Sequence, residues 1–168
     1  MSSPNESVRI ETATRSDVAV LLTLIRELAA YEHMSDQVIA TETDLTRALF
    51  SSRPEAEAVI AWRDNAAVGF ALYFQSFSTF VGRPGLYLED LFVRPVYRRR
   101  GIGRQLLAHL AQLAVARGCG RFEWSVLNWN KLAIGIYEKV GASPMNEWTV
   151  YRLSGNALSA LASETRPT

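Results

Sequence analysis

Apolar residues recur along this chain at the spacings that helices and strands require. Within residues 18–31, Leu21, Leu24 and Leu28 lie three or four positions apart, which places them on one face of a helix. Similar spacing, together with capping residues and glycine breaks, predicts three further helices. These are expected at residues 43–50, from residue 102 to about residue 118, and at 131–140.

Short runs of continuous or alternating apolar residues predict strands between these helices. The residues Arg63-Asp64-Asn65-Ala66 separate two such runs and predict a hairpin by their length and turn chemistry. The strands are expected at residues 8–12, 58–62, 67–74, 86–93, 121–127 and 148–153. The order of elements is that of an α/β or α+β protein whose sheet is flanked by helices.

The length and composition suit one soluble domain. No repeat or linker divides the 168 residues, so we expect a single domain over residues 1–168, with a core at about 8–153 and a polar C-terminal tail that frays. A net charge of +1 gives no general basic balance for nucleic acid. The single cysteine, Cys119, fits a reducing compartment, and no apolar run is long enough to span a membrane. We therefore expect a cytoplasmic protein that binds neither nucleic acid nor membranes.

The stretch from Leu86 to Leu107 carries the strongest chemical signal. Its strand holds Glu89 and Asp90 in the middle, where carboxylates are costly unless they are paired or used. Pro95 removes a backbone donor and ends the strand. The chain then turns through a glycine and arginine segment into the helix that begins near residue 102.

This turn has the features of an anion site. A helix N-terminus leaves about four N–H groups unpaired and carries a partial positive charge. Glycines at 101 and 103 allow close approach of a ligand, and five arginines add a field that favours a pyrophosphate. The arginines are Arg94, Arg98, Arg99, Arg100 and Arg104. The alternative is a tight turn that needs two glycines and is flanked by solvated arginines.

Two other phosphate motifs do not fit. Gly101 and Gly103 begin a G-x-G-x-x-G pattern, but its third position is Leu106, so a dinucleotide-binding site is not supported. The turn also lacks the Gly-Lys-Ser/Thr of a P-loop. A nucleic-acid module is disfavoured because the positive charge is confined to one turn.

Several segments together resemble the GCN5-related N-acetyltransferases (GNAT). Arg98 to Gly103 matches the Arg/Gln-x-x-Gly-x-Gly/Ala signature of that family. The chain is most similar to the diamine branch, which includes spermidine/spermine and thialysine acetyltransferases. The further segments that carry this likeness are 25–32, 86–90, Trp129-Asn130, Ile136-Tyr137 and Gly141-Ala142. The resemblance covers about residues 8–153.

The resemblance implies acetyl-CoA as co-substrate, no metal, and a fold with a mixed, mostly antiparallel sheet that is splayed at the acetyl-CoA site. The pantetheine arm would pair with exposed strand backbone, and the pyrophosphate would bind the turn. The residues implied for the cofactor are Leu91, Phe92, Val93, Arg98, Arg99, Arg100, Gly101, Ile102, Gly103, Arg104, Asn130, Lys131, Leu132, Ala133 and Tyr137. For Asn130 a plain helix cap is an equal and compatible alternative.

Acetyl transfer to an amine requires a neutral nitrogen, because an alkylammonium has no free lone pair. Glu89 is the candidate base, acting through a water, and Tyr137 is by resemblance the acid that protonates the departing thiolate. The alternatives are an ion pair between Glu89 and an arginine, and a core role for Tyr137. The sequence leaves these alternatives open.

The sequence says least about the acceptor, the molecule that receives the acetyl group. The residues that could contact an amine, by charge or by cation–π interaction, are Tyr31, Glu32, Glu89, Glu123, Trp124 and Ser125. The loop Phe77-Ser78-Thr79-Phe80 lacks the aspartate that polyamine-acetylating relatives use. We therefore expect acetylation of a small primary amine, lysine-like or a short diamine, in preference to spermidine. A protein amino group and a non-catalytic acyl-CoA sensor are the alternatives, and the resemblance also implies a homodimer.

Overall fold

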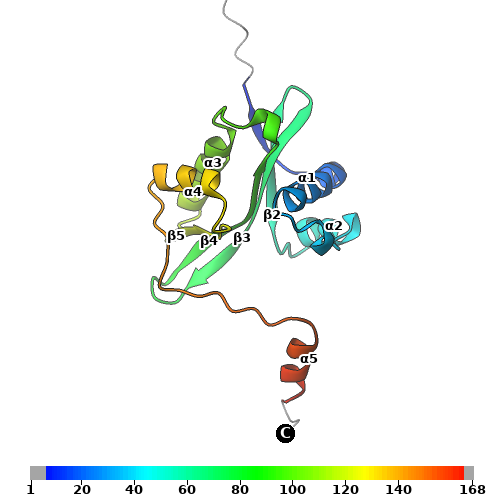
Figure 1. The fold of residues 1–168 in the computed structure, drawn as a ribbon, viewed down its shortest axis with the longest axis vertical. Helices are drawn as coiled ribbons and strands as arrows, with labels where there is room; N and C mark the ends of the chain where they lie inside the picture. The colour runs from blue at the N-terminus through cyan, green and yellow to red at the C-terminus, as the bar shows by residue number, and fades with distance from the viewer. Residues whose placement is uncertain (1–6, 165–168) are drawn as a thin grey trace, which may run out of the picture. The chain divides into compact units, whose positions relative to one another are not determined.

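A computed structural model of the protein describes residues 7–164, and its chain divides into two compact units, Met1–Leu127 and Asn128–Thr168. The first unit contains a five-stranded sheet in the order β1-β2-β3-β4-β5 (Figure 1). The first three pairings are antiparallel and the β4–β5 pairing is parallel. The strands are β1 Arg9–Thr12, β2 Glu57–Arg63, β3 Ala66–Ser78, β4 Arg83–Val93 and β5 Arg121–Trp124. The expected mixed, mostly antiparallel sheet is confirmed.

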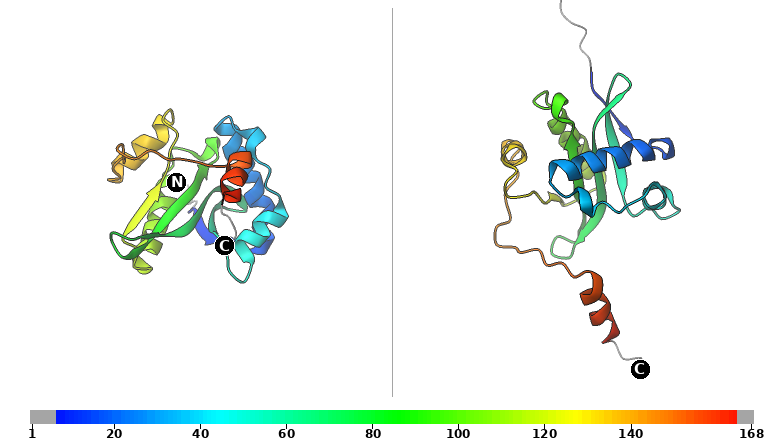
Figure 2. Two further views of the ribbon diagram at one scale, coloured as in Figure 1. Left: turned by 90° about the horizontal axis from the view of Figure 1, so that it is seen from below. Right: turned by 45° about the vertical axis from the view of Figure 1, so that its right-hand side comes forward.

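Helices cover both faces of this sheet. The helices α1 and α2 lie on one face and α3 on the other (Figures 1 and 2). Thr41 caps α2, since its hydroxyl accepts from the Asp44 N–H while the Asp44 carboxylate accepts from the Thr41 N–H. The helical segments of the first unit are η1 Arg15–Asp17, α1 Val18–Tyr31, η2 Ser35–Gln37, α2 Glu42–Phe50, η3 Pro95–Tyr97 and α3 Ile102–Ala116.

The core lies on both sides of the central strands. Residues 58–61 of β2 and 67–71 of β3 are buried without interruption, except that the glycine at 69 has no side chain to bury. On one face, Leu24 and Leu28 of α1 pack with Ile60 and Phe70. In α3, Ile102, Leu106, Leu107 and Leu110 are also buried. The sheet is therefore held between two helical layers, as its apolar runs require.

The pairing of β3 with β4 is interrupted by a bulge. Leu72 pairs with Asp90, whereas Tyr73 pairs with Leu88, so Glu89 is the extra residue of β4. A bulge bends a strand and changes the direction of its side chains, and bulges are frequent beside active sites. The predicted base therefore lies at the one irregular position in this pairing.

β4 and β5 separate part-way along their length. β5 pairs only with residues 85–88 of β4 and ends at Trp124, which is shorter than the expected strand to residue 127. Beyond that point β4 pairs with β3 on one side, and no strand in residues 7–164 pairs with its other edge. The splayed sheet is thus present, and its open edge belongs to residues 89–93.

The described part of the second unit, residues 128–164, contains two helices, α4 Lys131–Lys139 and α5 Gly155–Ser163. The prediction of a strand at 148–153 is wrong, because these residues form neither helix nor strand. An alternating pattern yields a strand only where a neighbouring strand supplies hydrogen bonds, and the described part of this unit has no strand. Helix α5 occupies much of the expected polar tail, and residues 165–168 lie outside the described part of the chain.

Candidate active site

The open edge of β4 presents backbone groups at two alternating residues. The Phe92 carbonyl oxygen lies against Gly69 of β3, so close that a Cβ at Gly69 would be 2.5 Å from it. The backbone groups of Phe92 therefore point toward β3, and by strand alternation those of Leu91 and Val93 point toward the open edge. Leu91 thus offers both of its backbone groups to an extended ligand and Val93 offers its N–H, since the Val93 carbonyl accepts from the Arg98 side chain.

The turn after β4 brings the N-terminus of α3 next to this edge. Gly101 is the N-cap residue of α3 and has a left-handed φ of 79°, which glycine adopts without strain. It has no side chain to cap the first N–H groups of α3. A Cβ at Gly103 would meet only the Val93 side chain, at 3.9 Å, so packing does not require glycine there. The first turn of α3 therefore keeps its donors and its positive partial charge for a ligand.

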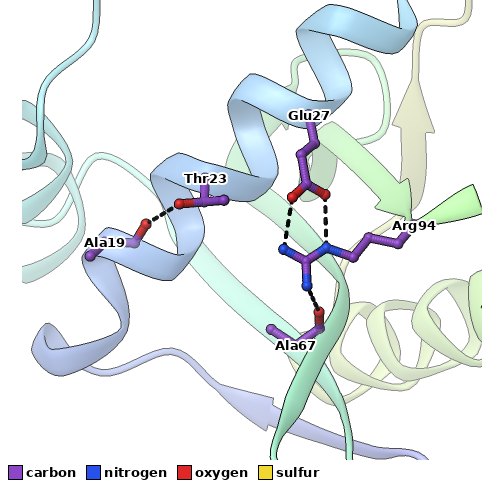
Figure 3. Close-up of polar contacts among 5 residues, drawn as sticks. All are labelled: Ala19, Thr23, Glu27, Ala67 and Arg94. Carbon is purple, nitrogen blue, oxygen red and sulfur yellow. Dashed lines mark hydrogen bonds and ion pairs between the residues drawn. The ribbon is translucent and has the colours of Figure 1, made fainter.

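The five arginines of this region do not act as one group. Arg94 makes a bidentate ion pair with Glu27 of α1, through hydrogen bonds of 2.8 and 2.7 Å, and also donates to the Ala67 carbonyl at 2.8 Å (Figure 3). These bonds tie α1 to the ends of β3 and β4. They also neutralise the Arg94 charge, so this arginine supports the fold beside the turn.

Arg98 is half-buried and is also held by the protein. Its Nε donates to the Val93 carbonyl at 2.8 Å, and its guanidinium carbon lies 4.1 Å from the centre of the Tyr31 ring. A second ring, that of Phe92, is 5.6 Å away. The exposed arginines that remain at the turn are Arg99, Arg100 and Arg104.

Three carboxylates influence one another between β4 and the end of α1. Burial, followed by the charges of Glu89 and Glu32, raises the pKa of Asp90 from 3.8 to about 6. Burial also raises the pKa of Glu32, the residue that follows α1. No basic side chain in residues 7–164 forms an ion pair with Glu89, so the ion-pair alternative for this residue is not supported. The region is therefore one that a cation would stabilise.

Asp90 was not among the site residues expected from the sequence. A carboxylate in the middle of a strand indicates a possible functional residue, but Glu89, one residue earlier, fits the same pattern. The effect of the Glu89 and Glu32 charges on the pKa of Asp90 assigns the three carboxyl groups to one acidic region.

The expected acceptor residues in β5 and just after it have partners in β5 or in β4. Glu123 forms an ion pair with Arg121 at 2.7 Å, and the Ser125 hydroxyl lies 3.0 Å from the Tyr87 hydroxyl. Trp124 packs edge-on against Phe122, with 4.9 Å between the ring centres. Because Arg121 already neutralises Glu123, the carboxylates beside β4 are better placed to attract an ammonium group.

The remaining expected residues belong to the second unit. The Asn130 side chain accepts from the Ala133 N–H at 3.2 Å and caps α4, so the cap alternative is confirmed for Asn130. The cap precedes Lys131, Leu132 and Ala133, the first residues of α4, and Tyr137 lies further along the same helix. The roles assigned to these residues in binding and catalysis stay predictions.

Comparison with known proteins identifies the family. The Acetyltransferase (GNAT) family profile matches residues 24–142. The chain belongs to the GNAT acetyltransferase family. It is 37% identical over 167 residues to thialysine N-epsilon-acetyltransferase of Sus scrofa, covering 93% of this chain and 98% of that protein. It is 33% identical over 199 residues to L-ornithine N5-acetyltransferase NATA1 of Arabidopsis thaliana, covering 91% and 87%.

A solved structure supports the same conclusion for the fold. An integron cassette protein from the mobile metagenome of V. cholerae matches this GNAT acetyltransferase with a TM-score of 0.78 and 32% identity, covering 93% of this chain and 98% of that one. The resemblance that the Arg98–Gly103 turn carried is thereby confirmed. The open edge of β4 and the uncapped α3 N-terminus are the parts of this GNAT fold that could hold an acyl-CoA.

The described residues show neither a metal-binding cluster nor a membrane-spanning helix. In residues 7–164, no three side chains of histidine, cysteine, aspartate or glutamate are arranged to hold a metal ion. Within the same residues no helix is both long enough and apolar enough to cross a membrane.

Proposed function

We propose that this GNAT acetyltransferase transfers the acetyl group of acetyl-CoA to a primary amine of a small lysine-like or short diamine molecule. One observation carries the proposal: the open edge of β4 lies beside an acidic region formed by Glu32, Glu89 and Asp90. The edge suits an acyl-CoA arm, and the carboxylates suit an ammonium group. The two substrates would therefore meet at the bulge of β4.

The cofactor would use backbone groups more than side chains. The two amides of the pantetheine arm would pair with Leu91 and Val93, as an added strand pairs with a sheet edge. The pyrophosphate would accept hydrogen bonds from the first turn of α3. The exposed arginines of the turn, Arg99, Arg100 and Arg104, would add attraction for the phosphates. In the second unit, Asn130 to Ala133 and Tyr137 are assigned to the same cofactor by the family resemblance.

The reaction would be a direct attack in a ternary complex. Glu89, through a water, takes a proton from the ammonium group, and the neutral nitrogen attacks the thioester carbonyl. The new N–C bond forms as the C–S bond breaks, and the electron pair leaves on sulfur. Tyr137 then protonates the thiolate. Asp90 and Glu32 hold the incoming cation by charge, with Tyr31 contributing its ring.

The preference for a small amine rests on the relatives and on the loop between β3 and β4. Thialysine and ornithine, the compounds in the relatives' names, are small amino acids with a side-chain amine. The loop residues Ser78, Thr79 and Phe80 carry no carboxylate for a second ammonium group of a polyamine. Bulky side chains in this loop could restrict access of a peptide to the acceptor side. Phe77 and Phe80 are 63% and 96% exposed in the described chain, so their rings do not provide such a restriction. A protein amino group is therefore the main competing acceptor.

We also propose that residues 1–168 act as one N-acetyltransferase domain in a cytoplasmic homodimer. The free thiol of Cys119 is consistent with a reducing compartment. The dimer rests on the family resemblance, because the strand at 148–153 that hinted at a shared sheet does not form in this chain. Light scattering at micromolar concentration should give about twice the monomer mass of 18.7 kDa, and a monomer would contradict the proposal.

Initial-rate kinetics test the proposed reaction. Release of the CoA thiol is followed while acetyl-CoA and thialysine are both varied, and direct attack predicts double-reciprocal lines that intersect. Parallel lines would instead indicate an acetyl-enzyme intermediate. Binding of acetyl-CoA without thiol release for any amine would favour the acyl-CoA sensor.

A further inference from the structure

Arg98 connects three segments. The proposed function assigns two of them to acetyl-CoA and the third to the amine. Arg98 lies in the turn that would bind the pyrophosphate, between η3 and α3. Its Nε holds the Val93 carbonyl at the open edge of β4, where the pantetheine arm would pair. Its guanidinium rests on the ring of Tyr31, the last residue of α1, and Glu32 follows directly.

The two contacts of Arg98 depend on one another. A guanidinium group is planar, so its Nε can donate to Val93 in the plane of the group while the face of the group rests on Tyr31. The distance of 4.1 Å from the guanidinium carbon to the ring centre is well within the range of a cation–π contact. A lysine at this position has a single ammonium group and no flat face, so it could not make both contacts. The link between the turn and α1 therefore requires arginine.

The other arginines of the region do not make this link. Arg94 joins α1 to the sheet through Glu27, one turn before Tyr31, and does not lie in the turn. Arg99 and Arg104 are exposed at the start of α3. Arg98 alone among the five contacts both the proposed cofactor edge and the proposed acceptor side, within the part of the chain that the structure describes.

We propose that Arg98 is a positioning residue that couples the binding of acetyl-CoA to the binding of the amine through Tyr31. The inference rests on the proposed function. Phosphates that order the turn would also fix the Arg98 guanidinium, and Arg98 would fix Tyr31 and Glu32 at the amine site. The coupling is reciprocal, so a bound amine strengthens cofactor binding by the same factor.

Calorimetry on the full chain measures this coupling directly. The affinity for thialysine is determined without and with saturating CoA, which lacks the acetyl group and therefore allows no reaction. In the wild-type protein, CoA should raise the affinity for thialysine by about 5- to 150-fold. In Arg98→Lys the ratio of the two affinities should fall to about 1 to 2.

Variants of Tyr31 and a matched arginine separate coupling from general damage. Tyr31→Phe keeps the aromatic face and should keep the wild-type ratio, whereas Tyr31→Leu should lose it as Arg98→Lys does. The double variant should lose no more than either single change. Arg104→Lys should weaken CoA binding but keep the ratio, since Arg104 touches only the proposed phosphate side.

The outcomes distinguish this inference from the proposed function. If CoA and thialysine each bind but the ratio is about 1 in the wild type, or is unchanged in both Arg98→Lys and Tyr31→Leu, the coupling role is wrong and the proposed function stands. If neither ligand binds the wild-type protein, the proposed function fails and the inference fails with it. Should Arg98→Lys not fold, the contrast between Tyr31→Leu and Tyr31→Phe decides the question.

Discussion

Asp90 carries a carboxyl group in surroundings that favour its protonated form. Burial is the main cause, with the charges of Glu89 and Glu32 adding to it, and together they raise the pKa from 3.8 to about 6. The folded protein therefore binds more protons than the unfolded chain between these two values. Its free energy of unfolding loses a contribution as the pH rises through this window, and the loss is complete above about pH 6. A bound ammonium group would reverse the effect.

Asp90→Asn should therefore change how stability depends on pH. Near pH 7.5 the variant should be more stable than the wild type by about 1 to 3 kcal/mol, and the difference should vanish toward pH 4. Urea unfolding at several pH values measures this. Asp44→Asn is the matched control, because hydrogen bonds from Thr41 lower the pKa of Asp44. It should lose stability above the ordinary pKa, and less so in acid. Parallel profiles for Asp90→Asn and wild type would contradict the assignment.

Glu89 and Tyr137 have separate roles in the proposed reaction, and kinetics can distinguish them. Tyr137→Phe removes the proton donor to sulfur and should lower kcat about a hundredfold, with acetyl-CoA affinity within about threefold of wild type. Glu89→Gln removes the base and should lower the rate most at low pH, where more of the amine is protonated. Steady-state kinetics from pH 6 to 9 measure both effects. Wild-type turnover in both variants would show that the chemistry is assigned to the wrong residues.

At the scale of elements, substitutions in the turn from β4 into α3 give the clearest test of the proposed phosphate site. Gly103→Asp should abolish the rise in melting temperature that we expect acetyl-CoA to produce, because its carboxylate would stand at the proposed phosphate site. The variant without ligand should melt no lower than wild type, since a negative charge favours a helix N-terminus. Gly103→Ala is the control: its Cβ makes only an ordinary contact with Val93, so most of the shift should persist. A shift with NAD in place of acetyl-CoA would contradict the site.

The elements that the sequence predicts well are those whose partners lie nearby in the chain. The apolar face of α1 gave the bounds Val18–Tyr31, and the turn at 63–66 gave the β2–β3 hairpin. Features that depend on distant partners were missed or wrong. The bulge at Glu89 arises from the register of β4 against β3, and the apolar alternation at 148–153 has no neighbouring strand to pair with.

The arginine turn shows the same limit for the site. Five arginines close in sequence suggested one positive field. Two of them instead contact α1, which lies far away in the chain: Arg94 contacts Glu27 and Arg98 contacts Tyr31. The order of glycines and the strand before them were enough to predict the helix N-terminus. Which charges remain for a ligand is decided by tertiary contacts that no local pattern contains.

At the scale of the whole molecule, family membership and the arrangement of the first unit lead to one account. In this GNAT acetyltransferase the sheet is splayed beside an uncapped helix N-terminus, and the acidic region lies at the same part of β4. We assign the edge to acetyl-CoA and the acidic region to a small amine. The relatives do not agree on that amine, since one is named for thialysine and another for L-ornithine.

A competition assay tests this account most directly. The full chain is incubated with acetyl-CoA and an equimolar panel of thialysine, lysine, putrescine, spermidine and a lysine-bearing peptide, and the products are resolved by mass. We predict a single added acetyl group, first on thialysine or another of the small lysine-like or diamine molecules. Preferential acetylation of spermidine would overturn the argument from the β3–β4 loop. Acetylation of the peptide alone would contradict the small-amine function.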